Sequence, residues 1–173
     1  MTDKKRLHRI GKMIAACEVY IVHGEEVLMH KRSTDKKKFP GYWIGPGGHI
    51  DAGEDALSAA IREVREETGV LINETDIKLK VLAFHHHIDR GEVWMEYLFR
   101  ARIPKKQLIE NTKEGSSEWL KIDKILSLEN VFPPSRYYFD HILNDKPGIM
   151  YNASEWKEAK LVRVLSEKVD KDS

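Results

Sequence analysis

The chain has one cysteine, almost no net charge and no long hydrophobic run, and each of these features excludes a class of protein. The single cysteine, Cys17, rules out a disulfide framework. The apolar run at residues 13–22 is too short to span a bilayer, and Glu18 interrupts it. The basic N-terminal residues are not followed by a signal-peptide core. A formal net charge of +1 argues against a strongly basic surface for duplex nucleic acid. We therefore expect a cytoplasmic protein with no membrane partner and no duplex nucleic-acid partner.

Length and composition predict one domain with a full hydrophobic core. The chain has 173 residues, and its hydrophobic and charged fractions of 41% and 33% are close to those of globular proteins. Cys17 belongs to a segment expected to be a buried strand, so we predict a packed thiol rather than a reactive one.

The apolar patterns predict strands on both sides of one long helix. Strands are expected at residues 13–22, 26–31, 78–86, 92–103 and 118–122. Turn sequences at residues 23–25 and 89–91 would close two hairpins. Helical patterns occur at residues 55–68, 122–128, 137–143 and 155–169, the last with Ser154 as a plausible N-cap. This order predicts an α/β sandwich with a mixed β-sheet between helices.

The helix expected at residues 55–68 carries an unusual group of acids. The segment is rich in Ala, Leu, Glu and Arg and lacks Gly and Pro, and Gly69 then supplies a C-cap signal. An apolar stripe should pack on the sheet, whereas Glu63, Glu66 and Glu67 gather on another face. Like charges at this spacing cost a helix roughly a few tenths of a kcal/mol per pair, unless a cation lies among them. Mg²⁺ prefers such oxygen ligands.

A simpler interpretation treats these acids as a solvated helix face paired with Arg62 and Arg65. It leaves the glycine-rich residues 46–48 and 52–54 unexplained, although both lie at a fixed distance before the carboxylates. Glycine runs allow backbone to approach a ligand closely.

The spacing of these residues resembles a family motif. Gly48 is followed after five residues by Glu54, then by Arg62-Glu63 and Glu66-Glu67, and finally by Gly69. This is the pattern of the Nudix box. The chain therefore resembles the Nudix hydrolases, which cleave nucleoside diphosphates linked to another moiety, usually with magnesium. The resemblance implies a Nudix-type α/β/α sandwich. We divide the chain into a basic N-terminal segment (1–12), a Nudix hydrolase domain (13–152) and a C-terminal helical extension (153–173).

The resemblance also implies a metal site and a mechanism. Glu63, Glu66 and Glu67, with the carbonyl of Gly47, would hold one or more Mg²⁺ ions, for which Mn²⁺ is a possible substitute. Arg62 would orient a carboxylate, and Glu54 would brace the loop. Water would be the nucleophile, deprotonated by Glu63, Glu66 or Glu114. Glu114 is also a candidate metal ligand.

Within the family, the likeness is greatest to MutT-type enzymes that hydrolyse oxidised nucleotides such as 8-oxo-dGTP. Residues 30–35 occupy the place of a phosphate-contacting motif, in which Arg32 would hold phosphates. Residues 113–115 resemble the loop with the additional glutamate, and residues 132–136 resemble the segment that reads the base. That segment ends in Arg136 instead of Asn, so Arg136 could bind a phosphate, stack on a base or lie on the surface. Trp43 could stack on a base or be buried.

Several alternatives remain open from the sequence. The substrate could instead be ADP-ribose, a nucleotide sugar or a capped RNA 5′ end, although marks of the first class are absent from residues 83–87. The domain could also be a sensor without catalysis. His85 and His87 would share one face of a strand, with His86 on the other, which favours a pocket or surface position over a zinc site. The stripe Leu161, Val162, Leu165 and Val169 would cover the protein's own core or a second subunit, so we expect a monomer or homodimer.

Overall fold

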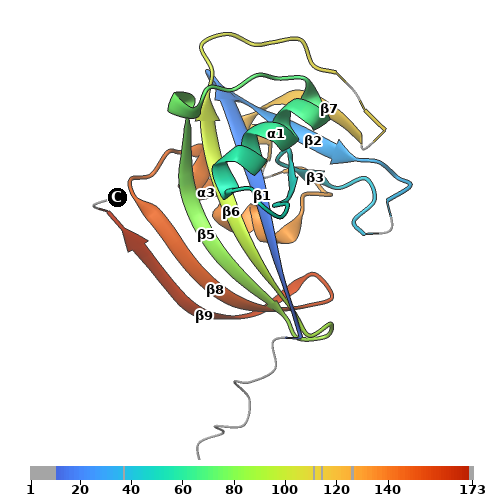
Figure 1. Ribbon diagram of the computed structural model, residues 1–173, viewed down its shortest axis with the longest axis vertical. Helices are drawn as coiled ribbons and strands as arrows, with labels where there is room; N and C mark the ends of the chain where they lie inside the picture. The colour runs from blue at the N-terminus through green and yellow to red at the C-terminus, as the bar shows by residue number, and fades with distance from the viewer. Residues whose placement is uncertain (1–10, 37, 111, 114, 126, 172–173) are drawn as a thin grey trace, which may run out of the picture.

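The computed structural model describes residues 11–36, 38–110, 112–113, 115–125 and 127–171 (Figure 1). These residues form one mixed sheet with helices on both faces. Its strands are β1 (Lys12–His23), β2 (Glu26–Arg32), β3 (Trp43–Ile44), β4 (Gly47–His49), β5 (Ile77–His87), β6 (Glu92–Arg102), β7 (Gly115–Lys121), β8 (Ile149–Lys157) and β9 (Lys160–Asp170). The helices are α1 (Ala56–Thr68), α2 (Ile122–Ile125) and α3 (Pro133–Leu143), with a short 3₁₀ turn η1 (Glu74–Asp76). The expected hairpins β1–β2 and β5–β6 are confirmed.

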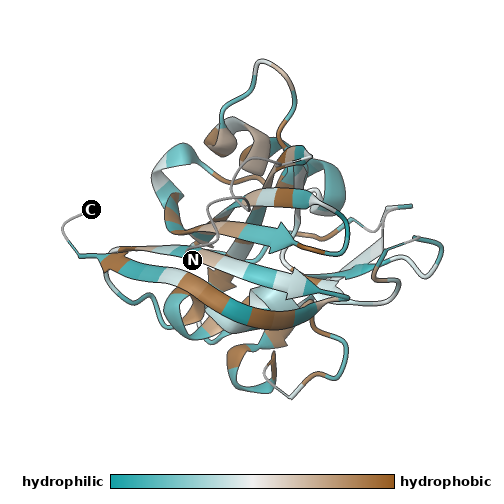
Figure 2. Cartoon of the chain, turned by 90° about the horizontal axis from the view of Figure 1, so that it is seen from below, coloured by the Kyte–Doolittle hydropathy of each residue, from teal (hydrophilic) through white to brown (hydrophobic). Residues whose placement is uncertain are grey.

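The order of the strands places β1 and β6 at the centre of the sheet. The order is β3-β2-β1-β6-β5-β8-β9, with β4 paired to β1 and β7 paired to β2. β1 and β6 run parallel, in a register that sets Ile14 beside Trp94 and Ala16 beside Glu96. Side chains alternate between the two faces of a strand. Cys17 therefore points to one layer of the molecule and Glu18 to the other. Figure 2 shows where hydrophobic and hydrophilic residues occur along the strands.

Helix α1 covers one face of the sheet and is closed at both ends by its own sequence. The side chain of Asp55 accepts bonds from the backbone N–H groups of Leu57 and Ser58, at 2.9 and 3.0 Å. Gly69 ends the helix with a φ of 72°, a left-handed conformation that glycine adopts readily. The buried stripe of α1 includes Ala60 and Val64 and packs against β1. The helix predicted at residues 55–68 is confirmed.

Helix α3 covers the opposite face. Tyr138, Phe139 and Ile142 are buried in a second hydrophobic cluster with Val81 and Leu98 from the sheet. The sandwich predicted from the sequence is therefore confirmed. No helix in the described part of the chain is long and apolar enough to cross a membrane.

The predicted C-terminal helix is wrong, because β8 and β9 occupy residues 149–157 and 160–170. The helix prediction relied on the apolar pattern of residues 155–169 and on Ser154 as an N-cap. Burial instead alternates with the period of a strand, and Asn152, Ser154 and Trp156 point inward. Ser154 is thus a buried strand residue, not an N-cap. Glu158 and Ala159 have positive φ values of 48° and 61° and form the turn between the strands.

The apolar stripe predicted on that helix lies on the edge strand β9. Leu161, Val162, Leu165 and Val169 are 39–51% exposed. The expectation that they cover the protein's own core is wrong, because β9 lies beyond β8 at the end of the sheet.

Candidate active site

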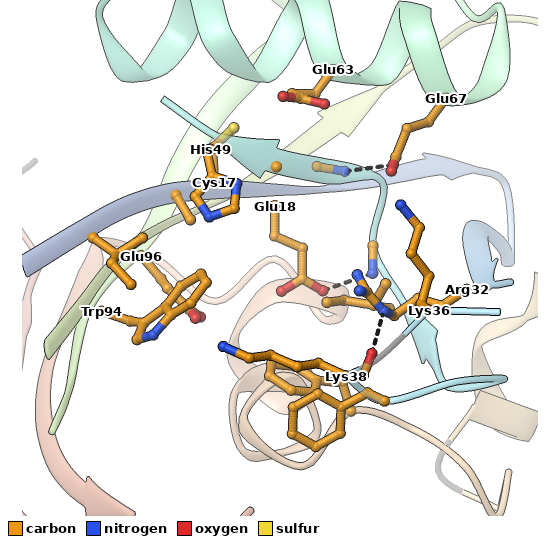
Figure 3. Close-up of a pocket in the computed structure, with 18 of the residues that line it drawn as sticks. Cys17, Glu18, Arg32, Lys36, Lys38, His49, Glu63, Glu67, Trp94 and Glu96 are labelled. Carbon is orange, nitrogen blue, oxygen red and sulfur yellow. Dashed lines mark hydrogen bonds between the residues drawn. The ribbon is translucent and has the colours of Figure 1, made fainter. Parts of the chain in front are cut away.

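A cavity of about 690 Å³ opens where β1, β6, the β4 segment and α1 meet. Figure 3 shows Glu63 and Glu67 of α1 at one end, and Trp94 and Glu96 of β6 at the other. Glu18 lies between them. The lining residues include acids from α1, cations from residues 32–38, and aromatic or acidic side chains from the sheet and nearby loops.

The carboxylates of α1 face the glycine-rich backbone of β4. Glu67 is 8% exposed, and its Oε2 accepts the N–H of Gly47 at 2.9 Å. Its Oε1 lies 4.0 Å from Nε2 of His30. A Cβ atom at Gly48 would lie 2.6 Å from Cδ of Glu63, so a larger residue there would displace this carboxylate.

Gly47, the glycine before Gly48 in β4, is equally constrained. A Cβ at Gly47 would lie 2.2 Å from the carbonyl oxygen of Cys17. The Cβ atom would clash with a backbone atom of β1, so no side-chain rotation could relieve the clash. The close approach of β4 to β1 explains the glycines that an ordinary acidic helix face leaves unexplained.

Arg62 forms hydrogen bonds with three acids of the Nudix-box segment. Its Nε and one terminal nitrogen donate to the two oxygens of Glu54 at 2.7 and 2.8 Å. The other terminal nitrogen contacts Glu63 at 2.8 Å and Glu66 at 3.3 Å. These bonds lower the pKa of Glu54 and raise the pKa of Arg62, which therefore stays charged. Glu54 consequently positions Arg62 and does not line the cavity.

The donor chemistry of this end fits a hard divalent cation. Glu63, Glu66 and Glu67 all line the cavity, and carboxylate oxygens are the ligands that Mg²⁺ prefers. Across the described residues, no three His, Cys, Asp or Glu side chains are already gathered as a metal site. The oxygens are held by Arg62 and by the N–H of Gly47. Glu114, the other predicted ligand, lies outside the described residues.

Five cationic side chains of the described residues line the cavity: Lys12, Arg90 and a rim formed by Arg32, Lys36 and Lys38. Lys37 lies outside the described residues. Nε of Arg32 donates to the carbonyl of Lys38 at 3.3 Å. Nζ of Lys38 lies 5.8 Å from the ring centroid of Trp94 on the other side of the cavity. This rim favours an anionic ligand.

Besides Glu54, two residues predicted at the substrate site do not line the cavity. Trp43 packs against the hydrophobic cluster beneath α3, and Nζ of Lys31 lies 5.4 Å from its ring. Arg136 is exposed, and its guanidinium donates to the carbonyl of Leu128. The surface position that the sequence left open for Arg136 is the one observed, whereas Trp43 is half-buried rather than buried.

Sequence reasoning missed several lining residues, among them Glu18, Trp94 and Glu96. The sequence did contain a signal for Glu18, which is the one acid within the apolar run of residues 13–22. Burying an acid costs free energy, so such a residue is a candidate for a functional role. Trp94 and Glu96 gave no such signal. Their strand was predicted, but its alignment beside β1 depends on tertiary pairing.

Glu18 is a buried carboxyl group at the floor of the cavity. It is 5% exposed and accepts bonds from the hydroxyl of Tyr20, the N–H of Gly45 at 2.7 Å and the hydroxyl of Ser135 at 3.0 Å. Burial raises the pKa of Glu18 to about 8, which these hydrogen bonds only partly oppose.

This raised pKa predicts that Glu18 makes stability depend on pH. An acid with a folded pKa above its unfolded value contributes full stability below pH 4.5, and this contribution is lost as pH rises toward 8. We expect Glu18→Gln to be more stable than the wild type at pH 8 by roughly 2–4 kcal/mol, or about 5–10 °C in Tm. Melting curves from pH 4.5 to 8.5 measure this gap. A gap that does not widen with pH would contradict the assignment.

The three consecutive histidines divide between the two faces of β5, as predicted. His85 and His87 are buried on one face, and His86 is half-buried on the other. Nε2 of His85 lies 2.9 Å from the hydroxyl of Tyr138, which donates to Asn152. His87 lines the cavity, and burial lowers its pKa to about 4, so it is neutral at pH 7. The thiol of Cys17 is buried, as predicted, and burial raises its pKa to about 11.

The chain belongs to the NUDIX family of hydrolases, because the model of the NUDIX domain matches residues 12–142. The crystal structure of a MutT protein from Bacillus halodurans superposes with a TM-score of 0.72 and 26% identity, covering 91% of this chain and 97% of that one. Proteins of this family act on small nucleotide compounds and generally use divalent metal ions.

Curated relatives share parts of the domain. The m7GpppN-mRNA hydrolase NUDT17 of Xenopus laevis is 44% identical over 70 residues, or 39% of this chain and 24% of that protein. The 8-oxo-dGDP phosphatase NUDT18 of Homo sapiens is 32% identical over 103 residues, or 60% of this chain and 29% of that protein. The chain thus spans about a quarter of the length of these two relatives.

Proposed function

We propose that this protein is a Mg²⁺-dependent pyrophosphohydrolase that cleaves a nucleoside triphosphate, such as an oxidised dNTP, to the monophosphate and pyrophosphate. The observation that carries the proposal is a single cavity with carboxylates at one end, cations at its rim and aromatic side chains at the other end. Its volume of about 690 Å³ suits a nucleotide. The partner would be a small nucleotide, and the protein would act as a monomer or homodimer.

The acidic end would hold the metal. Glu63, Glu66 and Glu67, with the carbonyl of Gly47 and with Glu114, are the proposed ligands. When bound there, Mg²⁺, for which Mn²⁺ could substitute, would supply Lewis-acid stabilisation of the negative charge that develops as a P–O bond breaks. Arg62 keeps Glu63 oriented toward the cavity through their 2.8 Å ion pair.

The remaining steps use protein groups alone. Arg32, Lys36 and Lys38 attract the phosphates to the rim. A carboxylate must orient and deprotonate the attacking water, and Glu63 and Glu66 are the candidates among the described residues. Glu114 remains a third candidate.

The relatives favour a guanine nucleotide but differ in what is cleaved. NUDT18 is named for 8-oxo-dGDP, and NUDT17 for a 5′ cap. The second candidate function is therefore hydrolysis of a capped RNA 5′ end, favoured by the 44% identity to NUDT17. ADP-ribose and nucleotide sugars have no comparable support.

A phosphate-release assay tests the proposed reaction. With Mg²⁺, we expect 8-oxo-dGTP to give phosphate only after inorganic pyrophosphatase is added, because pyrophosphate is the primary product. Direct release of phosphate from 8-oxo-dGDP would instead indicate a diphosphatase. Release of m7GDP from capped RNA would indicate decapping, and phosphate from ADP-ribose after alkaline phosphatase would indicate the sugar class. Binding of a nucleotide without any product would show a sensor and contradict the proposal.

A further inference from the structure

The end of the cavity away from α1 holds two buried carboxyl groups that the proposed hydrolysis does not use. Glu18 and Glu96 are 5% and 9% exposed, on the adjacent strands β1 and β6. Both line the cavity, as do Trp94, Phe39 and Phe132. The rings of Phe39 and Phe132 pack edge to face at 4.8 Å and form an apolar wall. Burying carboxyl groups is costly unless they meet hydrogen-bond donors.

The two carboxyl groups differ in how they are satisfied by the protein. Glu18 receives three bonds, from Tyr20, Gly45 and Ser135. Glu96 has its Oε2 3.4 Å from Nδ1 of His85. This contact is not a hydrogen bond, because Nδ1 of His85 has no hydrogen-bond partner within the described residues. Glu96 therefore brings acceptor oxygens to the cavity wall, and among the described residues it has few hydrogen-bond donors of its own.

We propose that Glu96 selects the nucleobase, and that the base has the hydrogen-bonding edge of guanine. This inference rests on the proposed function. An ionised carboxylate only accepts hydrogen bonds, through two oxygens side by side. Guanine presents two adjacent donors, its N1–H and its exocyclic amino group, which match such a pair. Adenine presents an amino group beside an acceptor nitrogen, and thymine presents one N–H between two carbonyls. Adenine would therefore place an acceptor nitrogen against one carboxylate oxygen. Thymine would place a carbonyl oxygen there.

Glu18 supports this selection from the floor of the cavity. Its three bonds connect β1, the segment before β4 and the start of α3, so the wall beside Glu96 is held in place. Trp94, two residues before Glu96 on β6, contributes an aromatic surface on the same face. The base would then lie beside the rings of Trp94, Phe39 and Phe132, with its donor edge toward Glu96 and its phosphates toward Arg32 and α1.

Three nucleotides that differ only in the base edge test the inference. With the wild type, we expect kcat/KM for dGTP to exceed that for dITP, which lacks the exocyclic amino group, by about 10-fold, and that for dATP by about 100-fold. Glu96→Gln should reduce the preference for dGTP over dATP at least about 10-fold, because the amide presents a donor to a donor. Its kcat/KM for dATP should change by less than about 3-fold. Glu96→Asp, which keeps the carboxylate, should retain the order of preference.

Binding without turnover separates the two proposals. Titration calorimetry with dGMP, dIMP and dAMP should show the same order in Kd for the wild type and its collapse in Glu96→Gln. Glu129→Gln, an exposed change outside the cavity, is the matched control and should leave every ratio unchanged. Hydrolysis of all three triphosphates at equal kcat/KM, or an unchanged ratio in Glu96→Gln, would overturn the inference while leaving the proposed hydrolysis intact. Ordered binding with no hydrolysis would support the inference and overturn the hydrolysis. If Glu96→Gln fails to fold, the wild-type series and Glu96→Asp still decide.

Discussion

Replacing Glu67 with Gln is expected to lower turnover by on the order of 1000-fold while the protein stays folded. Glu67 is buried, lines the cavity and is one of the proposed metal ligands. The amide has nearly the same shape, and its oxygen can still accept the N–H of Gly47 that Glu67 accepts at 2.9 Å. It lacks the negative charge that a divalent cation requires.

Steady-state kinetics with Mg²⁺ over a range of concentrations measures this effect, and the melting temperature reports the fold. We expect Tm to change by less than about 3 °C. Glu74→Gln, in the exposed turn η1, is the control and should keep wild-type turnover. Wild-type turnover in Glu67→Gln would refute the assignment of Glu67 to the metal site.

Replacing Arg62 with Ala is expected to lower kcat/KM by about 100-fold and to reduce stability as well. The change removes the cation that holds Glu54, Glu63 and Glu66. Three carboxylates then repel one another, and Glu63 loses the bond that fixes its orientation. Arg65, on the same helix but exposed, provides the control, and Arg65→Ala should retain activity and Tm.

Arg62→Lys distinguishes charge from geometry at this position. Lysine keeps the positive charge but cannot donate to both oxygens of Glu54 in the forked arrangement that Arg62 makes at 2.7 and 2.8 Å. We therefore expect Tm to recover more than kcat/KM. Full recovery of both by lysine would show that the fork contributes nothing to the orientation of Glu63.

The box helix and the two hairpins could be predicted because their signals are local. Asp55, Gly69 and the apolar stripe lie within one segment, so capping and periodicity define α1 without any tertiary contact. The turns at Gly24 and Gly91 have φ values of 59° and 63°, which glycine supplies at no steric cost.

The C-terminal strands and the far end of the cavity could not be predicted for the opposite reason. Residues 155–169 favour helix by local propensity, but pairing of β8 with β5 buries Asn152, Ser154 and Trp156 in a way that only a strand allows. Glu96 similarly reaches the cavity only because β6 lies parallel to β1 in one register. Arg136 was considered as a base or phosphate contact because of its place in a motif, and the structure turns it to the surface.

The central strand β1 serves both layers of the molecule at once. Cys17, Val19 and Ile21 belong to the core beneath α1, whereas Glu18 and Tyr20 point to the side of the cavity and α3. A single inserted or deleted residue within β1 would exchange these two sets, so the acid and the phenol would turn toward the core beneath α1 while Val19 and Ile21 would turn toward α3 and the floor that Glu18 now forms. A substitution in this strand changes one face only, whereas a change in its length should abolish folding and activity together.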